Sequence, residues 1–360
     1  MSERQVPVVV LAGFLGSGKT TLLNHLLHSS RGSRIGAIVN DFGAIEIDAM
    51  AVAGALGDST VSLGNGCLCC AVDASDLDAY LDKLTRPSAR IDVVVIEASG
   101  LAEPQELVRM VLASENPRVV YGGLVEVVDA AEFDSTRERH PEIERHLAIA
   151  DLVVVNKADR VPEEDRERTI GLVRGLARRA AVVPASYGRI DPELLFDRKP
   201  AEERIGQLSF DDMHEHGDAD DQGDHLHAAY DSLSFISEVP LSPRRLMEFL
   251  ERRPEGLYRI KGHVDFGAAD VRNRYVVHAV GPFLRFYPEP WATGAARLTQ
   301  LVLIGSGIDG AALYKELDGT RDGSLRSPDA PHADEHGMWG VLRYVEEPED
   351  PAEPEQAEAD

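Results

Sequence analysis

Residues 6–27 read VPVVVLAGFLGSGKTTLLNHLL, which is a β-branched run, a glycine-rich loop and an apolar helical pattern in succession. The loop, residues 13–20, matches the pattern G-x-x-x-x-G-K-[ST]. In this pattern, backbone N–H groups of the loop and of the following helix N-terminus surround phosphate oxygens, and glycines permit the close approach. We therefore expect a strand, a phosphate-binding loop and a helix that together bind a nucleotide.

Side chains of the loop should take separate roles. We expect Lys19 to reach the β and γ phosphates and the Thr20 hydroxyl to bind Mg²⁺. A second apolar run ends at Glu97, whose carboxylate should meet the same sheet edge and hold Mg²⁺ or a metal-bound water. Lys19, Thr20 and Glu97 are the candidate catalytic residues. The predicted phosphate-binding residues are Gly13, Gly16, Ser17, Gly18, Lys19, Thr20 and Thr21.

The first half of the chain alternates β-branched runs with helical patterns. After residues 6–12, further runs occupy residues 35–40, 92–97, 121–129, 152–156 and 181–185. This alternation, with nearly continuous apolar strands, is typical of a parallel sheet covered by helices on both faces. Residues 1–196 are therefore predicted to form a three-layer α/β P-loop domain with a mostly parallel sheet.

The second half begins with a change in composition. Residues 197–230 are polar and acidic and are predicted to be a linker. Residues 231–320 show strand and helix patterns in the order βαβββα, which favours a smaller α+β domain with an antiparallel sheet. The acidic, proline-containing residues 321–360 are predicted to be a disordered tail.

The charge balance bears on the class of partner. Lysine and arginine total 37 residues against 62 aspartates and glutamates, a formal net charge of -25, which would repel a phosphate backbone. We therefore expect no nucleic-acid partner. No apolar run reaches the about 20 residues that span a bilayer, and the N-terminus lacks signal-peptide features, so the sequence predicts a cytoplasmic protein without membrane contact.

A third apolar run ends in a segment that favours guanine over adenine. Asn156, Lys157 and Asp159 form N-K-x-D, in which the aspartate accepts hydrogen bonds from the guanine ring N–H and exocyclic amine. Buried polar groups that the wrong base leaves unpaired cost affinity, so GTP is the predicted nucleotide. The alternative is that Asp159 merely caps a helix. Residues 185–188 are a further candidate for base contact.

All the cysteines of the chain lie close together. Cys67, Cys69 and Cys70 are its only three cysteines, and thiolates bind zinc and other soft metals. Zinc prefers four ligands, so three local thiols leave a position open, which suits a site that releases its metal. The alternatives are plain packing in a loop and a redox switch.

Histidines in the acidic linker form a second candidate for metal capture. They alternate with aspartates, a composition that can bind divalent metals weakly, although a solvated linker explains it equally well. These residues are His214, His216, His225 and His227. His332 and His336, further along the chain, are weaker candidates.

The motifs taken together resemble the CobW-like family of P-loop GTPase metallochaperones. The segments that carry the resemblance are GFLGSGKT, VNDFGAIEID, GNGCLCC, EASGLAEP and NKAD, and KGHVDF is similar to the C-terminal domain of the family. The resemblance implies slow GTP hydrolysis linked to metal delivery, with zinc or a related ion on Cys67, Cys69 and Cys70. It also makes Asp41 a further candidate ligand and Asp48 a candidate switch residue near Mg²⁺.

One segment departs from the family pattern. The family usually has N-E-F-G-E, whereas residues 40–44 read NDFGA. Asp41 is a shorter acid and Ala44 has no ligand atom, so the departure bears on the choice of metal and on the rate of hydrolysis.

The resulting hypothesis is a GTPase that couples its nucleotide cycle to binding a transition metal, first of all zinc, and delivering it to a client protein. Cobalt and nickel remain alternative metals, since spacing does not choose among them. A P-loop kinase and a metal-binding scaffold with negligible turnover are the rival interpretations. The sequence is also compatible with a homo-oligomer and names no client.

Overall fold

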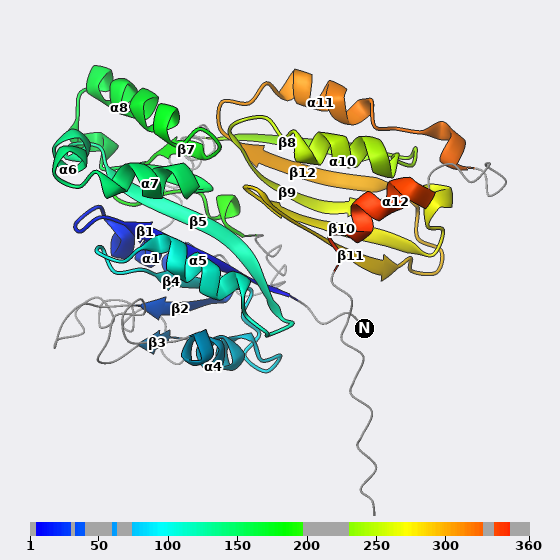
Figure 1. Ribbon diagram of the computed structural model, residues 1–360, viewed down its shortest axis with the longest axis horizontal. Helices are drawn as coiled ribbons and strands as arrows, with labels where there is room; N and C mark the ends of the chain where they lie inside the picture. Colours follow the sequence, from blue (N-terminus) through cyan, green and yellow to red (C-terminus); the bar gives the residue numbers. More distant parts are fainter. Residues whose placement is uncertain are drawn as a thin grey trace, which may run out of the picture.

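The computed structural model describes residues 5–29, 33–39, 60–62, 74–196, 230–326 and 335–345. These residues form two sheets, one in each half of the chain, with helices packed against them (Figure 1). None of the helices within these ranges is long and apolar enough to cross a bilayer.

The first sheet has seven strands in the order β3-β2-β4-β1-β5-β6-β7, and all its ladders are parallel. The strands are β1 (Val6–Gly13), β2 (Ile35–Val39), β3 (Thr60–Ser62), β4 (Val93–Glu97), β5 (Val119–Asp129), β6 (Leu152–Asn156) and β7 (Ala181–Pro184). The predicted parallel sheet is confirmed. The short edge strand β3 was not predicted, because three residues carry too little periodicity.

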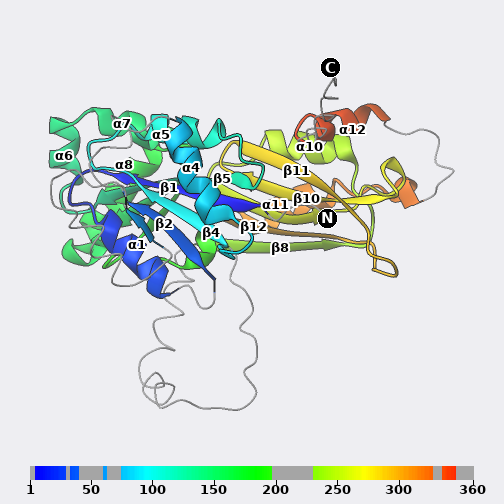
Figure 2. The same cartoon turned by 90° about the horizontal axis from the view of Figure 1, so that it is seen from below.

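Helices cover both faces of this sheet, but unequally (Figure 2). α1 (Lys19–His28) packs on one face, and the cluster around it includes the segment 190–196 and side chains of the second domain. The opposite face contacts α4 (Ala74–Thr85), α5 (Pro104–Leu112), α6 (Phe133–Arg139), α7 (Glu142–Ile149) and α8 (Glu163–Leu176). Alternate strand residues point to the two faces, as Leu11 and Val10 illustrate.

The second sheet is antiparallel, with five strands in the order β11-β10-β9-β12-β8. Its strands are β8 (Asp231–Ser237), β9 (Leu257–Val264), β10 (Asn273–Val280), β11 (Phe283–Pro290) and β12 (Thr299–Gly305). α10 (Pro243–Glu251), α11 (Gly310–Asp318) and α12 (Glu335–Leu342) enclose its apolar core. The predicted antiparallel α+β domain is confirmed, but the order βαβββα was wrong, because it lacked β11.

The predicted tail requires a correction. Residues 321–360 were expected to be disordered, yet α12 packs against α10 and buries Met338 and Val341 in the core of the second domain. Leu325 is buried as well. The error arose because the acidic composition of the last residues was extended to an apolar segment, HGMWGVL, that precedes them.

The second domain contacts the amino ends of strands in the first sheet, and the phosphate loop lies at the opposite, carboxyl ends of the strands (Figure 1). His278 Nε2 donates to the carbonyl oxygen of Tyr121 near the start of β5, at 2.8 Å. Ser306 Oγ donates to the carbonyl oxygen of Val182 near the start of β7, at 2.9 Å. Tyr258 of β9 belongs to the same apolar cluster as the leucines of α1. The two domains therefore share part of their core.

Candidate nucleotide site

The phosphate loop connects β1 to α1 at the carboxyl edge of the first sheet, and it requires glycine at two close approaches. A Cβ on Gly13, whose φ is 144°, would lie 2.3 Å from the carbonyl oxygen of Val127. A Cβ on Gly18, whose φ is 103°, would lie 2.2 Å from Asn156 Nδ2. Both positions combine a positive φ, which residues with a side chain rarely adopt, with a lack of space for a Cβ atom. The loop therefore packs closely against β5 and against the end of β6.

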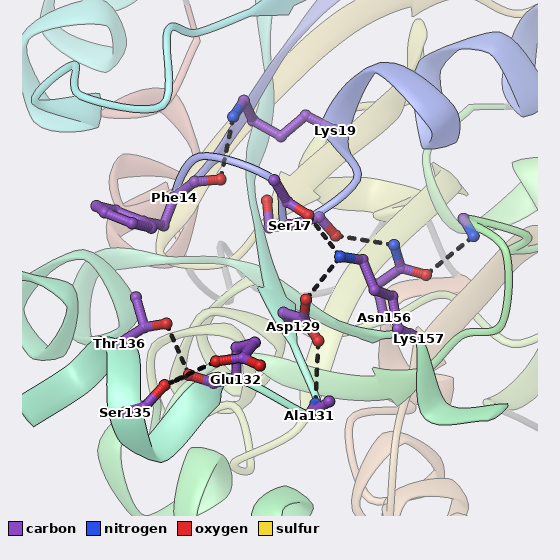
Figure 3. A network of polar contacts seen from close by, with 12 residues as sticks. Phe14, Ser17, Lys19, Asp129, Ala131, Glu132, Ser135, Thr136, Asn156 and Lys157 are labelled. Atoms are coloured by element: carbon purple, nitrogen blue, oxygen red, sulfur yellow. Dashed lines mark hydrogen bonds and ion pairs between the residues drawn. The ribbon is translucent and has the colours of Figure 1, made fainter. Parts of the chain in front are cut away.

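The lysine of the loop folds back over it. Lys19 Nζ donates to the carbonyl oxygen of Phe14 at 3.3 Å (Figure 3). It also donates to that of Gly13 at 2.9 Å, and the lysine is buried. Its ammonium group thus lies over the peptide groups that would surround a phosphate. Phosphate oxygens are stronger acceptors for this cation than neutral carbonyls.

The predicted Mg²⁺ ligands meet directly. Thr20 Oγ1 donates to Glu97 Oε1 at 2.6 Å, although the two residues are far apart in the sequence. Because β4 pairs with β1, Glu97 lies beside Leu11. Glu97 is buried, with only 3% of its surface exposed. A hydroxyl and a carboxylate side by side form the hard oxygen donor set that Mg²⁺ prefers. The residues present therefore fit this ion.

The segment 156–159 is hydrogen-bonded to the phosphate loop. Asn156 Nδ2 donates to the carbonyl oxygen of Ser17 at 2.9 Å, and Asn156 Oδ1 accepts from the backbone N–H of Gly188 at 2.9 Å. Lys157 Nζ donates to the carbonyl oxygen of Gly16 at 2.7 Å (Figure 3). The predicted phosphate-binding and base-binding segments are thus joined through side chains.

Asp159 lies beside these contacts with its side chain exposed. It belongs to the short 3-10 helix η2 (Ala158–Arg160), whose N-cap position is occupied by Lys157, so Asp159 does not act as the helix cap. Ala158 N–H donates to the carbonyl oxygen of Ala185 at 3.0 Å, which brings the loop 185–188 alongside. The two segments proposed to contact a base therefore meet at one edge of the site.

Sequence reasoning missed Asp129, the last residue of β5. Its Oδ2 accepts from Lys157 Nζ at 2.6 Å, and its Oδ1 accepts from the backbone N–H of Ala131 at 3.0 Å (Figure 3). The carboxylate holds the ammonium group that also binds Gly16. An acidic residue at the end of an apolar strand was the available signal, the same one that singled out Glu97.

Several candidate ligands lie outside the described residues. These are Asp41, Asp48, Cys67, Cys69, Cys70, His214, His216, His225, His227 and His332. Their roles stay predictions. Within the described ranges, no group of three or more histidine, cysteine, aspartate or glutamate side chains has the geometry of a metal site.

A cavity of about 170 Å³ adjoins the phosphate loop on the side of α5 and α7. Gly13 and Phe14 line it together with residues 100–104 and the start of α7. At its rim the Glu103 carboxylate lies 3.2 Å from His146 Nε2 and 3.8 Å from Arg145. The segment after β4 and the helix α7 therefore meet beside the loop.

Two family models match the chain. "CobW/HypB/UreG, nucleotide-binding domain" matches residues 7–184, and "Cobalamin synthesis protein cobW C-terminal domain" matches residues 230–321. These ranges contain the phosphate loop with its base-recognition segment and the antiparallel sheet, respectively.

Known proteins resemble the chain over most of its length. The zinc chaperone CobW of Pseudomonas aeruginosa is 32% identical over 347 residues, which cover 87% of this chain and 91% of that protein. The zinc chaperone CobW of a Sinorhizobium species is 29% identical over 341 residues, which cover 84% and 94%. The crystal structure of the Zn(II)-bound YjiA GTPase from E. coli covers 89% of this chain and all of its own, at 22% identity and a TM-score of 0.43. On the family models and the P. aeruginosa relative, the chain belongs to the CobW family of P-loop GTPases.

Proposed function

We propose that the protein is a GTP-hydrolysing metallochaperone, which couples its nucleotide cycle to binding a transition metal, first of all zinc, and transferring it to a client protein. The observation that carries the nucleotide part is the direct link from Asn156 and Lys157 to the carbonyl oxygens of Ser17 and Gly16. A base held by residues 156–159 would thereby have its phosphates in the loop 13–20.

The base-recognition segment favours guanine for a chemical reason. Asp159 has an exposed carboxylate, which can accept from the two adjacent donors of guanine, and adenine presents no such pair. A site built to pair polar groups rejects a ligand that leaves them unpaired. This preference speaks against the P-loop kinase alternative.

Hydrolysis requires groups that stabilise the charge that develops on the transferred phosphoryl group. Lys19 supplies a positive charge over the loop, and backbone N–H groups at the start of α1 supply partial positive charge. Mg²⁺ would neutralise phosphate charge when bound, with Thr20 and Glu97 as its protein ligands and Asp48 as a further candidate. Glu97 would hold the ion directly or through a water.

The metal is the cargo of this cycle. Cys67, Cys69 and Cys70 are the proposed thiolate ligands. Three thiolates leave one of the four positions around zinc, for Asp41 or for a ligand of the client that takes the metal. The names of the two CobW relatives as zinc chaperones support zinc as the cargo. Cobalt and nickel are the alternatives. The linker histidines would add weak capture, and a cytoplasmic location would give access to clients.

The test is GTP turnover by the purified full-length protein with zinc, cobalt or nickel. We would compare the wild type with a Cys67→Ser, Cys69→Ser, Cys70→Ser variant, and use Lys19→Ala to measure turnover from contaminants. We expect zinc to change wild-type turnover or nucleotide affinity and the serine variant to lose this response. Because linkage is reciprocal, zinc affinity should differ between the GTP-analogue and GDP states by the same factor. Identical turnover with and without metal in both proteins would reduce the proposal to a plain GTPase.

A further inference from the structure

A carboxyl group that the proposed cycle does not use lies under the phosphate loop. Glu126 is on β5, where its Cα pairs with Ala12 of β1, the residue just before Gly13. On its other side it pairs with Val153 of β6. The side chain is 1% exposed. Glu126 is therefore a buried acidic residue in the sheet, and its partner in the β1–β5 pairing is the residue just before the phosphate loop.

The surroundings of Glu126 are apolar. Alternation along β5 directs its side chain to the face covered by α5 and α7, between Leu124 in one apolar cluster and Val128 in the next. Within the part of the chain that the structure describes, Glu126 Oε2 is buried and has no hydrogen-bond partner. Burial of a charged carboxylate without a partner is costly, so such a group holds its proton.

Lys19 is the charge that acts on this carboxyl group. Burial raises the pKa of Glu126 to about 8, and the positive charge of Lys19 opposes part of that increase. The covering helices α5 and α7 carry further charged and titratable groups. At the cavity rim, Glu103, which precedes α5, is paired with Arg145 and His146 of α7. The other charged groups of these helices are Glu106 and Arg109 on α5 and Glu142 and Glu144 on α7. β1 and β6 contribute only uncharged residues to this face.

We propose that Glu126 is a positioning residue that sets, through its own proton, how strongly Lys19 binds nucleotide phosphates. When Glu126 is neutral, the full charge of Lys19 is available to the phosphates. When Glu126 is ionised, it attracts Lys19 and adds a negative charge beneath the phosphate site. This inference rests on the proposed function, since it concerns the same nucleotide site.

The sign of the effect follows from linkage. Bound phosphates are negative and favour the neutral form of Glu126, so their binding raises its pKa further and takes up a proton where the free protein is partly ionised. Nucleotide affinity must then fall as pH rises through the range near pH 8, by up to tenfold per pH unit for one proton. Phosphate groups titrate near pH 6 and are already deprotonated there.

The experiment is calorimetric titration of GDP into the full-length protein between about pH 7 and about pH 9, a range chosen around the titration of Glu126. Each point is measured in two buffers of different ionisation enthalpy, which gives the number of protons taken up. The variant is Glu126→Gln. The control is Asp151→Asn, a buried acid at the other edge of the sheet with a pKa raised by burial to about 6, so that it is already ionised in this range.

We expect the wild type and Asp151→Asn to take up a proton near pH 8 and to lose GDP affinity as pH rises. Glu126→Gln should take up none there and keep its affinity, apart from any change due to guanine itself, which all three proteins share. Equal pH slopes in wild type and Glu126→Gln would overturn the inference alone. If the variant does not fold, the absence of proton uptake by the wild type overturns it. Failure of the wild type itself to bind GDP would remove the proposed function as well.

Discussion

The contacts of single side chains explain why the phosphate loop and the base-recognition segment act as one unit. Asn156 is the last residue of β6 and Lys157 follows it, and each donates a hydrogen bond to a carbonyl oxygen of the loop. Lys157 adopts a left-handed backbone with φ 58°, which is unusual for a residue with a side chain. Such a conformation persists where surrounding contacts hold it, and here the Asp129 carboxylate supplies one of them.

Substitution of Asp129 by asparagine tests this contact. We expect Asp129→Asn to weaken both GDP and GTP binding by about tenfold or more, since a hydrogen bond to a charged group contributes about 1.5 to 3 kcal/mol. The carboxylate now serves both Ala131 N–H and Lys157 Nζ. The two donors contact different oxygens of the carboxylate, and asparagine replaces one of these oxygens by an NH2 group, which cannot accept a hydrogen bond. Titration of a fluorescent guanine nucleotide would give the affinities.

A matched variant separates this effect from the loss of one surface charge. Asp134 also forms an ion pair, with Arg168 at 2.8 Å, but both side chains are about half exposed to solvent. We expect Asp134→Asn to change nucleotide affinity by less than about twofold, because exposed ion pairs contribute little. Similar losses in the two variants would mean that the Asp129 contact does not support the site.

At the residue level, the sequence predicted the groups that belong to short patterns. Lys19, Thr20 and Asn156 follow from local motifs, and Glu97 follows from its position at a strand end. The contact of Asp129 with Lys157 depends on β5 and β6 being neighbours, which periodicity does not reveal. The burial of Glu126 beside the phosphate loop was missed for a related reason, since a single acid in an apolar run was interpreted only as part of a strand.

At the level of elements, the sequence predicted those with strong local patterns and missed three that depend on tertiary packing. β3 has three residues. β11 contains Pro288 and Pro290, which a strand tolerates because β11 is at the edge of its sheet. α12 contains Gly337 and Gly340, which weaken a helix in isolation. Their stability comes from neighbouring elements, and single-chain periodicity carries no information about those neighbours.

The buried side chains of α12 should therefore contribute to the stability of the second domain. We expect Met338→Ala to lower the free energy of unfolding of the second domain by about 2 kcal/mol or more, since it removes a buried side chain and leaves a cavity. Leu342→Ala, on the same helix but 47% exposed, should cost much less. Urea unfolding followed by tryptophan fluorescence measures this domain, because both tryptophans of the chain, Trp291 and Trp339, lie in it. Equal effects of the two substitutions would mean that α12 is not part of the core.

At the level of the whole molecule, the nucleotide site lies at the carboxyl ends of the strands of the first sheet, and the second domain contacts their amino ends. The loop follows the carboxyl end of β1, whereas the second domain contacts the amino ends of β5 to β7. A signal from the nucleotide to the second domain must then pass through the strands or through residues outside the described ranges. Asp151 stands at this junction, where it accepts from Tyr121 Oη at 2.5 Å and from Leu124 N–H at 2.8 Å.

The junction leaves no room at Gly281. This glycine lies in the turn between β10 and β11, with φ 51°, and a Cβ there would stand 1.7 Å from Asp151 Oδ1. Gly294 provides a matched control, because its φ is 80° and no atom lies within 4 Å of its virtual Cβ. Alanine at either position carries the strain of a left-handed backbone, but only Gly281→Ala adds a clash between the domains.

We expect Gly281→Ala to lower the stability of the protein by at least about 2 kcal/mol more than Gly294→Ala and to separate thermal unfolding into two transitions, one for each domain. Guanine nucleotide affinity should stay within about twofold of the wild type, since the clash lies at the edge of the sheet away from the loop. Calorimetric unfolding and nucleotide titration on the same samples give both results. If affinity instead falls together with stability, the interface and the nucleotide site are coupled through the sheet, and the second domain takes part in the nucleotide cycle directly.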